Sequence, residues 1–188
     1  MIGNNQWRQQ RGFTLAEMIV TVGVFAIALS IASVVILSVN KLQQNTANLE
    51  KLQNEGRYLM EKMAKEVRGR ALDYSQLSSD LDGVASTLVF KQDELGETLA
   101  ISYLPDDQAI RLTSAQDGRT NSANLNSEEV LVTSAKFIVN PLLDPATEST
   151  PLEQPRVTIL LTLKNRDGRA EFQKQLTLQT TISSNIYR

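Results

Sequence analysis

The sequence contains no cysteine and no histidine among its 188 residues. Without cysteine, a disulfide framework, a Cys-ligated zinc site, thiol catalysis and lipid attachment through Cys are excluded. Without histidine, the chain lacks the commonest general base and the commonest metal ligand. The formal net charge is only −2, from 19 basic and 21 acidic side chains, which argues against nucleic acid as a partner. We therefore predict no enzymatic activity, no cofactor and no metal site.

The apolar residues are concentrated in one run near the N-terminus. Residues 18–39 contain no charged side chain and nothing more polar than Ser or Thr. As a helix they would span ~33 Å, which matches the ~30 Å hydrocarbon core of a bilayer. A core helix of a soluble protein would normally carry a polar stripe, and a secretory signal has an apolar region of only about 7–15 residues. A membrane-spanning helix is favoured over both alternatives.

Basic residues flank this run on its N-terminal side. Arg8 and Arg11 are the charged residues of segment 1–12, which contains no acid. The cytoplasmic flanks of membrane helices are enriched in Lys and Arg. We therefore predict a single-pass membrane protein with its N-terminus in the cytoplasm and everything after residue 40 outside.

A short motif stands directly before the apolar run: Arg11-Gly12-Phe13-Thr14-Leu15-Ala16-Glu17. With the basic leader before it and the apolar run behind it, the motif resembles the class III signal of type IV prepilins and type II secretion pseudopilins. The resemblance implies that prepilin peptidase cuts between Gly12 and Phe13 at the bacterial inner membrane, and that Phe13 is N-methylated. It also implies, as partners, membrane lipid, other pilin or pseudopilin subunits and the inner-membrane assembly platform, with a later location in a cell-surface or periplasmic filament.

Two residues of the motif have a direct physical reason. Gly12 has no side chain, so the backbone can enter a protease cleft closely. Glu17 places a carboxylate about one turn inside a membrane helix, which costs a few kcal/mol near the bilayer centre and less near its edge. The family supplies a partner for Glu17, the positive α-amine of Phe13 on a neighbouring subunit or on the same chain. The alternative is that Glu17 lies at the lipid headgroups or caps the first helical turn.

From Lys41 the pattern becomes that of an amphipathic helix. Its apolar stripe consists of residues at three- and four-residue steps, namely Leu42, Leu49, Leu52, Gly56, Leu59, Met60, Met63, Val67 and Leu72. No proline precedes Pro105, so one helix is predicted from about residue 14 to about residue 72. A basic run near its end, formed by Lys62, Lys65, Arg68 and Arg70, is conceivable as a DNA-binding patch. The interleaved acids Glu61 and Glu66 favour a solvated helix end instead.

The rest of the chain predicts a β-rich head. Strand-like stretches are Ser86–Lys91, Thr98–Leu104, Ala109–Thr113, Glu129–Val139, Arg156–Lys164 and Ala170–Ser183. Turns are expected at Pro105–Asp107 and at Asp167-Gly168, and two segments, Ser114–Ser127 and Asn140–Pro155, are expected to be mobile. Asp80-Leu81-Asp82-Gly83 is a fragment of a calcium-binding loop, for which ordinary turn chemistry is favoured. The predicted fold is α+β and pilin-like, a long N-terminal helical spine packed on a mainly antiparallel sheet.

These patterns divide the chain into four parts: a leader (1–12), the membrane-spanning or filament-core half of the helix (13–39), its amphipathic half (40–72) and a globular head (73–188). The resemblance implies a structural subunit of a type IV pilus or type II secretion pseudopilus. A minor subunit such as pseudopilin J is favoured, because the stretch Leu59–Arg68 is similar and because a proline in the apolar helix and a C-terminal Cys pair are absent. The alternative is an uncleaved, membrane-anchored extracellular binding or adhesion module.

Overall fold

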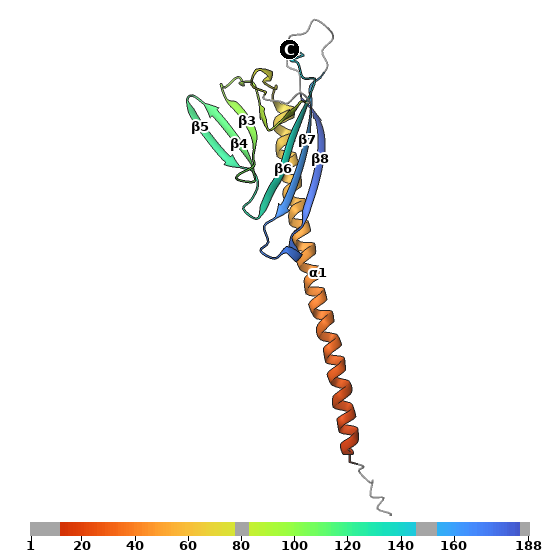
Figure 1. Ribbon diagram of the computed structural model, residues 1–188. Coiled ribbons are helices and arrows are strands. Elements are labelled where there is room, and N and C mark those ends of the chain that lie inside the picture. The colour runs from red at the N-terminus through yellow and green to blue at the C-terminus, as the bar shows by residue number, and fades with distance from the viewer. Residues whose placement is uncertain (1–11, 78–82, 146–153, 185–188) are drawn as a thin grey trace, which may run out of the picture. The chain divides into compact units, whose positions relative to one another are not determined.

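A single long helix opens the structure (Figure 1). The computed structural model describes residues 12–77, 83–145 and 154–184. The chain divides into two compact units, residues 1–44 and residues 45–188, and each is described by itself. Helix α1, Leu15–Gly69, is continuous through both. It begins as predicted and ends at Gly69 rather than near residue 72, where Leu72 instead forms an antiparallel bridge with Phe90.

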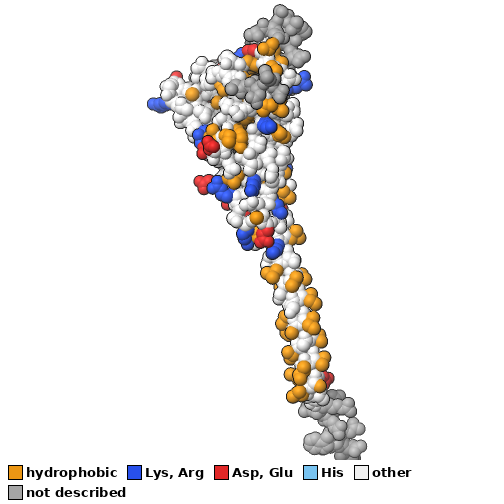
Figure 2. All heavy atoms as spheres, in the orientation of Figure 1, with side chains coloured by type: hydrophobic (Ala, Val, Ile, Leu, Met, Phe, Trp, Pro, Cys, Tyr) orange, Lys and Arg blue, Asp and Glu red, His pale blue; other side chains and the backbone are white. Residues whose placement is uncertain are grey.

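The first unit contains α1 up to Gln44. Every side chain from Gly12 to Gln44 is exposed, including those of the apolar run. Figure 2 shows hydrophobic side chains along the visible face of this part of the helix. Among the described residues, α1 is the one helix long and apolar enough to cross a membrane. An apolar surface of this extent requires lipid or other helices around it.

The second unit contains two four-stranded antiparallel sheets and the rest of α1. One sheet has the order β1-β6-β7-β8, with β1 Val84–Ala85, β6 Val130–Asn140, β7 Arg156–Asn165 and β8 Gln175–Ser183. The other has the order β2-β3-β4-β5, with β2 Thr87–Val89, β3 Thr98–Leu104, β4 Ala109–Gln116 and β5 Arg119–Asn124. The predicted α+β, pilin-like fold with antiparallel strands packed on the helical spine is confirmed, and its strands are divided between two sheets rather than one. The chain leaves the first sheet at Ser86, between β1 and β2, and strand composition does not reveal such a change of partner.

The core of the second unit is formed by one stripe of α1 and the facing side of the sheet. The helical residues that are buried are Leu52, Gly56, Leu59, Met63, Ala64 and Val67. They pack with alternate residues of the strands, such as Ile159, Leu161 and Leu163 of β7. Leu42 and Leu49 were predicted to belong to this stripe but are 66% and 39% exposed. In the second unit the half-buried Asn48 lies where the stripe was expected to continue, and its side chain binds the β7–β8 connection instead.

Two of the predicted connections differ in the structure. Ser114–Ser127, expected to be mobile, contains the end of β4 and all of β5, joined by a tight turn at Asp117-Gly118, whose φ angles are 50° and 74°. An Asp-Gly pair with positive φ angles is typical of a two-residue hairpin, so the signal was present in the sequence.

The hairpin expected at Asp167-Gly168 is instead a longer connection that contains a short 3-10 helix, η2, Ala170–Phe172. Strand β8 consequently begins at Gln175 rather than at Ala170. The buried Asn165 explains the difference, since its side chain binds the Phe172 carbonyl and the Lys174 N–H and so closes a wider loop.

The strand and the turn predicted within residues 98–107 were confirmed. β3 has the predicted bounds, and the turn after it begins at Pro105. The segment expected to be mobile at 140–155 falls partly on residues 146–153, which lie outside the described residues, as do Asp80 and Asp82.

Candidate functional site

Three of the predicted site residues, Gly12, Phe13 and Glu17, lie just before and within the first turn of α1. Thr14 stands immediately before Leu15, and its hydroxyl accepts a hydrogen bond from the Glu17 N–H at 3.2 Å. The Thr14 carbonyl accepts from the Met18 N–H at 3.1 Å, as in the first turn of an α-helix. Thr14 is therefore the N-cap residue, which satisfies one of the N–H groups that a helix start leaves unpaired.

This capping role of Thr14 was missed in the sequence. Thr followed three residues later by Glu is the spacing of a capping box, so the signal was available. The structure shows the half of that motif in which the Thr14 hydroxyl binds the residue-17 N–H. This bond uses the backbone of Glu17 and leaves its carboxylate without a role in it.

The other hydroxyl side chains of the apolar run have partners within the helix. Thr21 donates to the Glu17 carbonyl at 2.9 Å, Ser30 to the Ala26 carbonyl at 2.9 Å and Ser33 to the Leu29 carbonyl at 2.8 Å. Ser38 donates in the same way to the Val34 carbonyl, at 2.9 Å. Such bonds to the carbonyl four residues earlier satisfy a hydroxyl in a medium without water.

The Glu17 carboxylate differs from these hydroxyls. Its side chain is exposed, and within the described part of the chain it forms no ion pair and no hydrogen bond. Of the polar side chains between Thr14 and Val39, all of them described, it is the one without a partner. A carboxylate in this position requires an external cation or contact with water.

The Gly12–Phe13 junction precedes the helix in non-helical backbone. Both residues are exposed, Phe13 to 76%, and a Cβ added to Gly12 would meet no atom within 4 Å. The junction is therefore open to an enzyme in this conformation. Arg8 and Arg11, which the sequence assigns to the leader, lie outside the described residues.

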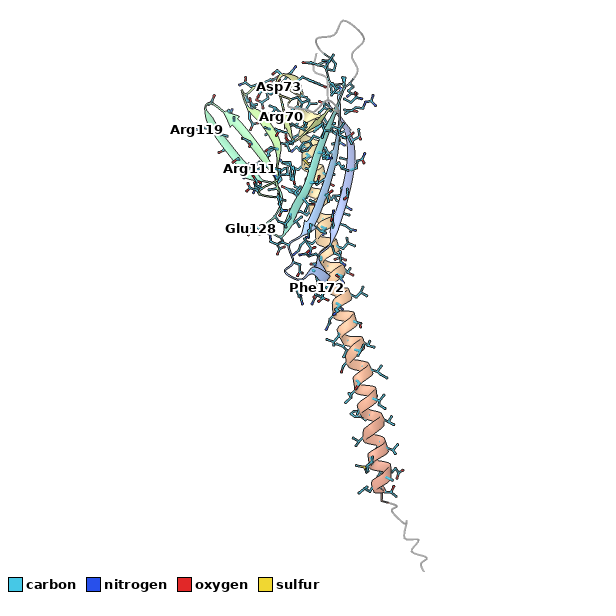
Figure 3. All side chains as sticks on the ribbon, in the orientation of Figure 1. Arg70, Asp73, Arg111, Arg119, Glu128 and Phe172 are labelled. Carbon is cyan, nitrogen blue, oxygen red and sulfur yellow. The ribbon has the colours of Figure 1, made fainter. Side chains whose placement is uncertain are left out.

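The basic run at the end of α1 is divided by ion pairs. The Arg70 guanidinium lies 2.6 Å from Glu97, 3.3 Å from Asp93 and 3.6 Å from Glu66. Figure 3 labels Arg70 beside the end of α1. Lys62 also pairs with Glu66, at 3.4 Å. Lys65 and Arg68 are the two exposed members. Arg70 thus fixes the helix end to the β2–β3 connection, an arrangement that does not form a continuous cationic surface for a nucleic acid.

The described acidic residues of the head do not form a metal site. Among the described residues, no group of three or more Asp or Glu side chains is arranged to hold a metal ion. Tyr74 has a buried hydroxyl, and burial together with the nearby Asp144 carboxylate raises its pKa to about 12. A phenol that holds its proton this firmly is unsuited to proton transfer near neutral pH.

Comparison with known families gives one result, and it falls on the same segment. Residues 7–33 match the family described as the prokaryotic N-terminal methylation motif. No curated protein and no solved structure matches the chain. The match contains the Gly12–Phe13 junction, Glu17 and most of the apolar run. The N-terminal segment thus carries a prepilin-type signal, which supports a role like that of a type IV pilin or a pseudopilin. The long apolar first part of α1 fits an anchor in the inner membrane.

Proposed function

We propose that this chain is a structural subunit, of the minor kind, of a type IV pilus or a type II secretion pseudopilus. Prepilin peptidase removes residues 1–12 and methylates Phe13. The mature chain is then anchored in the inner membrane with its head outside. It enters the filament when its α1 packs against the helices of other subunits. The match at residues 7–33 and the exposed apolar surface of α1 support this proposal.

The observation that carries the proposal is the unpartnered Glu17 carboxylate. The hydroxyls of the apolar run are satisfied within the helix, whereas Glu17 has no partner in the described chain. A cut after Gly12 creates a positive α-amine on Phe13, four residues before Glu17. In a bundle of such helices, the amine of one subunit supplies the cation that the Glu17 of its neighbour lacks.

The test uses a deletion strain complemented with Glu17→Leu and Glu17→Asp, scored separately for membrane level, cleavage and filament or secretion output. Leucine removes the carboxylate but keeps the backbone N–H of residue 17. This N–H still donates its hydrogen bond to the Thr14 hydroxyl, so the helix start is preserved. Loss of one member of a buried ion pair costs about 3–5 kcal/mol. A loss of ~1.4 kcal/mol lowers an equilibrium constant tenfold. We therefore expect the amount of the Glu17→Leu chain in filaments to fall at least about a hundredfold.

A matched variant separates the carboxylate from the cap. Thr14→Ala removes the capping hydroxyl, which is worth about 1 kcal/mol, and leaves Glu17 unchanged. We expect this variant to retain most of its output, and Thr14→Ser to retain all of it. If Glu17→Leu gave full output while Thr14→Ala did not, Glu17 would be a passive edge residue.

That result would favour the second candidate function, an uncleaved membrane anchor for an extracellular binding or adhesion head. The separate β-rich unit at residues 45–188 is the observation that supports this alternative. An anchored module requires neither Glu17 nor a cut at Gly12. Normal function of chains altered at both positions would therefore support this alternative.

A further inference from the structure

The outer edge of β8 carries unpaired backbone groups. β8 is the last strand of its sheet and pairs with β7 alone. At its two ends, the Asn165 N–H donates to the Lys174 carbonyl at 3.2 Å and the Ser184 N–H donates to the Pro155 carbonyl at 2.8 Å. Hydrogen-bonded and non-hydrogen-bonded pairs alternate along an antiparallel ladder.

That alternation determines which residues of β8 bond to β7. Counting from the two bonded ends, the bonded residues are Leu176, Leu178, Thr180 and Ile182. The pairs between them are non-bonded, and two of these bring threonine hydroxyls together: Thr158 with Thr181 at 2.8 Å, and Thr162 with Thr177 at 3.2 Å. The N–H and C=O groups that point away from β7 therefore belong to Gln175, Thr177, Gln179, Thr181 and Ser183.

This edge has none of the usual protection against a further strand. Proteins protect sheet edges with proline, with charged residues, with bulges or by keeping the edge strand short. Residues 175–183 contain no proline and no charge, and their pairing with β7 shows no register shift. The other outer strands differ, since β1 has two residues, β2 has three and β5 begins with Arg119. β8 is thus the long open edge of the described sheets.

A hollow lies beside β8, between this strand and the last turns of α1. It has a volume of about 490 Å³, and Met60, Ala64 and Thr180 line it together with the charged Glu61, Lys65 and Arg68. Lys65 and Arg68 are exposed and form no ion pair within the described part of the chain. The hollow offers an apolar floor and two available cations to side chains that project from a strand added to β8.

The sheet surface next to this edge is also cationic. On the side of β6, β7 and β8 that faces away from α1, the charged residues are Lys136, Arg156 and Lys164, and none of the described residues there is acidic. Figure 2 shows separate Lys or Arg side chains spaced along this part of the molecule. The whole chain is slightly acidic, whereas the described charged residues of this sheet surface are all basic, which favours an acidic partner.

We propose that the outer edge of β8 is a docking site for an extended, acidic polypeptide segment of another chain, which adds to the sheet as a fifth strand. Its backbone pairs with Thr177, Gln179 and Thr181, as in other cases of strand addition. Its carboxylates face Lys65 and Arg68, and its apolar side chains enter the hollow. A second copy of this chain fits less well, because β8 has no acid and a β8–β8 pair would leave these cations unneutralised. The proposal concerns the head and goes beyond the assembly role of α1.

The test measures binding of a nine-residue peptide to the full-length chain in detergent. Every second residue of the peptide is threonine and the residues between are valine or glutamate, so that valine and glutamate project together toward the hollow. Two further peptides carry Gln or Lys in place of Glu. The main variant is Gln179→Pro, which removes an N–H that points away from β7 and leaves the ladder bonds of Leu178 and Thr180 in place. Gln179→Ala keeps the N–H and is the matched control, and thermal unfolding shows that each variant is folded.

We expect the Glu peptide to bind at least about tenfold more tightly than the Gln peptide, and Gln179→Pro to weaken its binding at least about tenfold. Gln179→Ala should bind within about twofold of the parent, since the edge backbone is unchanged. Bound peptide should also slow amide exchange at Thr177, Gln179 and Thr181. The pair Lys65→Glu and Arg68→Glu should reverse the preference, so that the Lys peptide binds best.

Four results would overturn the proposal. Equal binding by the Gln179→Pro and Gln179→Ala chains would place the peptide elsewhere, as would unchanged exchange along β8. Equal binding of the Glu and Gln peptides would show that the edge does not select an acidic segment. Dimerisation of the parent chain in sedimentation, lost in Gln179→Pro, would identify the occupant as a second copy. None of these results bears on Glu17, so the assembly role is tested separately.

Discussion

Gly56 of α1 packs directly against Leu178 of β8. A methyl group on Gly56 would overlap the Leu178 side chain and would lie 3.1 Å from Cδ1 of Leu163. Gly56 is buried within the apolar stripe that joins the helix to the sheet. The missing side chain therefore allows the helix to approach two strands closely, at a position where glycine weakens the helix itself by about 1 kcal/mol relative to alanine.

Replacing Gly56 with a large side chain should destabilise the head. We expect Gly56→Leu to lower the free energy of unfolding by about 1–3 kcal/mol, because overpacking outweighs the gain in helix propensity. Asn54→Leu, at an exposed position of the same helix, is the matched control and should change stability little. Chemical unfolding of the full-length chain in detergent measures both. Equal stability of the two variants would show that α1 does not lie against β8 at this point.

The position of Gly56 was predictable, and its partner was not. Steps of three and four residues placed Leu52, Gly56, Leu59 and Met63 on one face of the helix, and all four are buried. Periodicity along a helix gives the buried face but does not say where a sheet ends. Leu49 has the correct spacing and is still 39% exposed, since the polar side chain of Asn48 faces the head there instead.

The β-rich part was predicted least well where strands are polar. β3 shows a clear strand composition and has the predicted bounds, whereas β5 consists of polar and small residues that are exposed on both faces. β5 forms a strand because it pairs with β4 across the Asp117-Gly118 turn. A search for alternating apolar residues therefore could not find this strand. At the candidate site, the sequence predicts roles for Gly12, Phe13 and Glu17. The capping role of Thr14 was missed, although its spacing to Glu17 is that of a capping box.

Asn48 should stabilise the long connection between β7 and β8. Its side-chain amide donates to the Phe172 carbonyl at 3.0 Å and to the Asp167 carboxylate at 3.4 Å. Asn48→Ala removes both bonds and should cost about 1 kcal/mol of unfolding free energy. Asn48→Asp should cost more, because it replaces the donor with a carboxylate that faces a carbonyl and a second carboxylate.

Gln53→Ala, at an exposed position of the same helix, is the control for the Asn48 variants. Chemical unfolding measures stability, and amide exchange across residues 166–174 measures local opening. If Asn48→Asp and Gln53→Ala were equally stable, the contact between the helix and this connection would contribute nothing.

Tyr74 should make the head less stable at high pH. Burial, and then the charge of Asp144, raises the pKa of its hydroxyl from 10.0 to about 12. The folded state therefore holds the proton more firmly than the unfolded state, so this contribution to stability is complete below pH 10 and is lost as the pH rises toward 12. Tyr74→Phe should remove this part of the pH dependence.

The same variant should be neutral or slightly stabilising at pH 7. The Tyr74 hydroxyl is buried without a hydrogen-bond partner in the described chain, and phenylalanine removes that unsatisfied group. Tyr58→Phe, at a residue that is 51% exposed, is the control. Thermal unfolding at neutral pH and above pH 10 compares the two. A marked loss of stability in Tyr74→Phe at pH 7 would mean that the hydroxyl has a partner.

Gly12 should be required for maturation. Phe13 is the residue that fits the new N-terminus, since it directly precedes the Thr14 cap and the helix start at Leu15. Protein from the native host should therefore lack residues 1–12 and carry one additional methyl group, as measured by intact mass. Gly12→Val should block the cut, because a β-branched side chain would lie against the cleft of the peptidase where glycine leaves the backbone bare.

Gly3→Val is the matched control for that change, since it alters another glycine of the same leader away from the junction. It should be cut and methylated normally, whereas Gly12→Val should accumulate uncut in the membrane fraction. Without a new amine on Phe13, the neighbouring Glu17 has no cation to pair with, so uncut chains should also be absent from filaments. A mature chain that still begins at Met1 in cells with active prepilin peptidase would refute the processing step, and filaments containing that chain would refute the pairing as well.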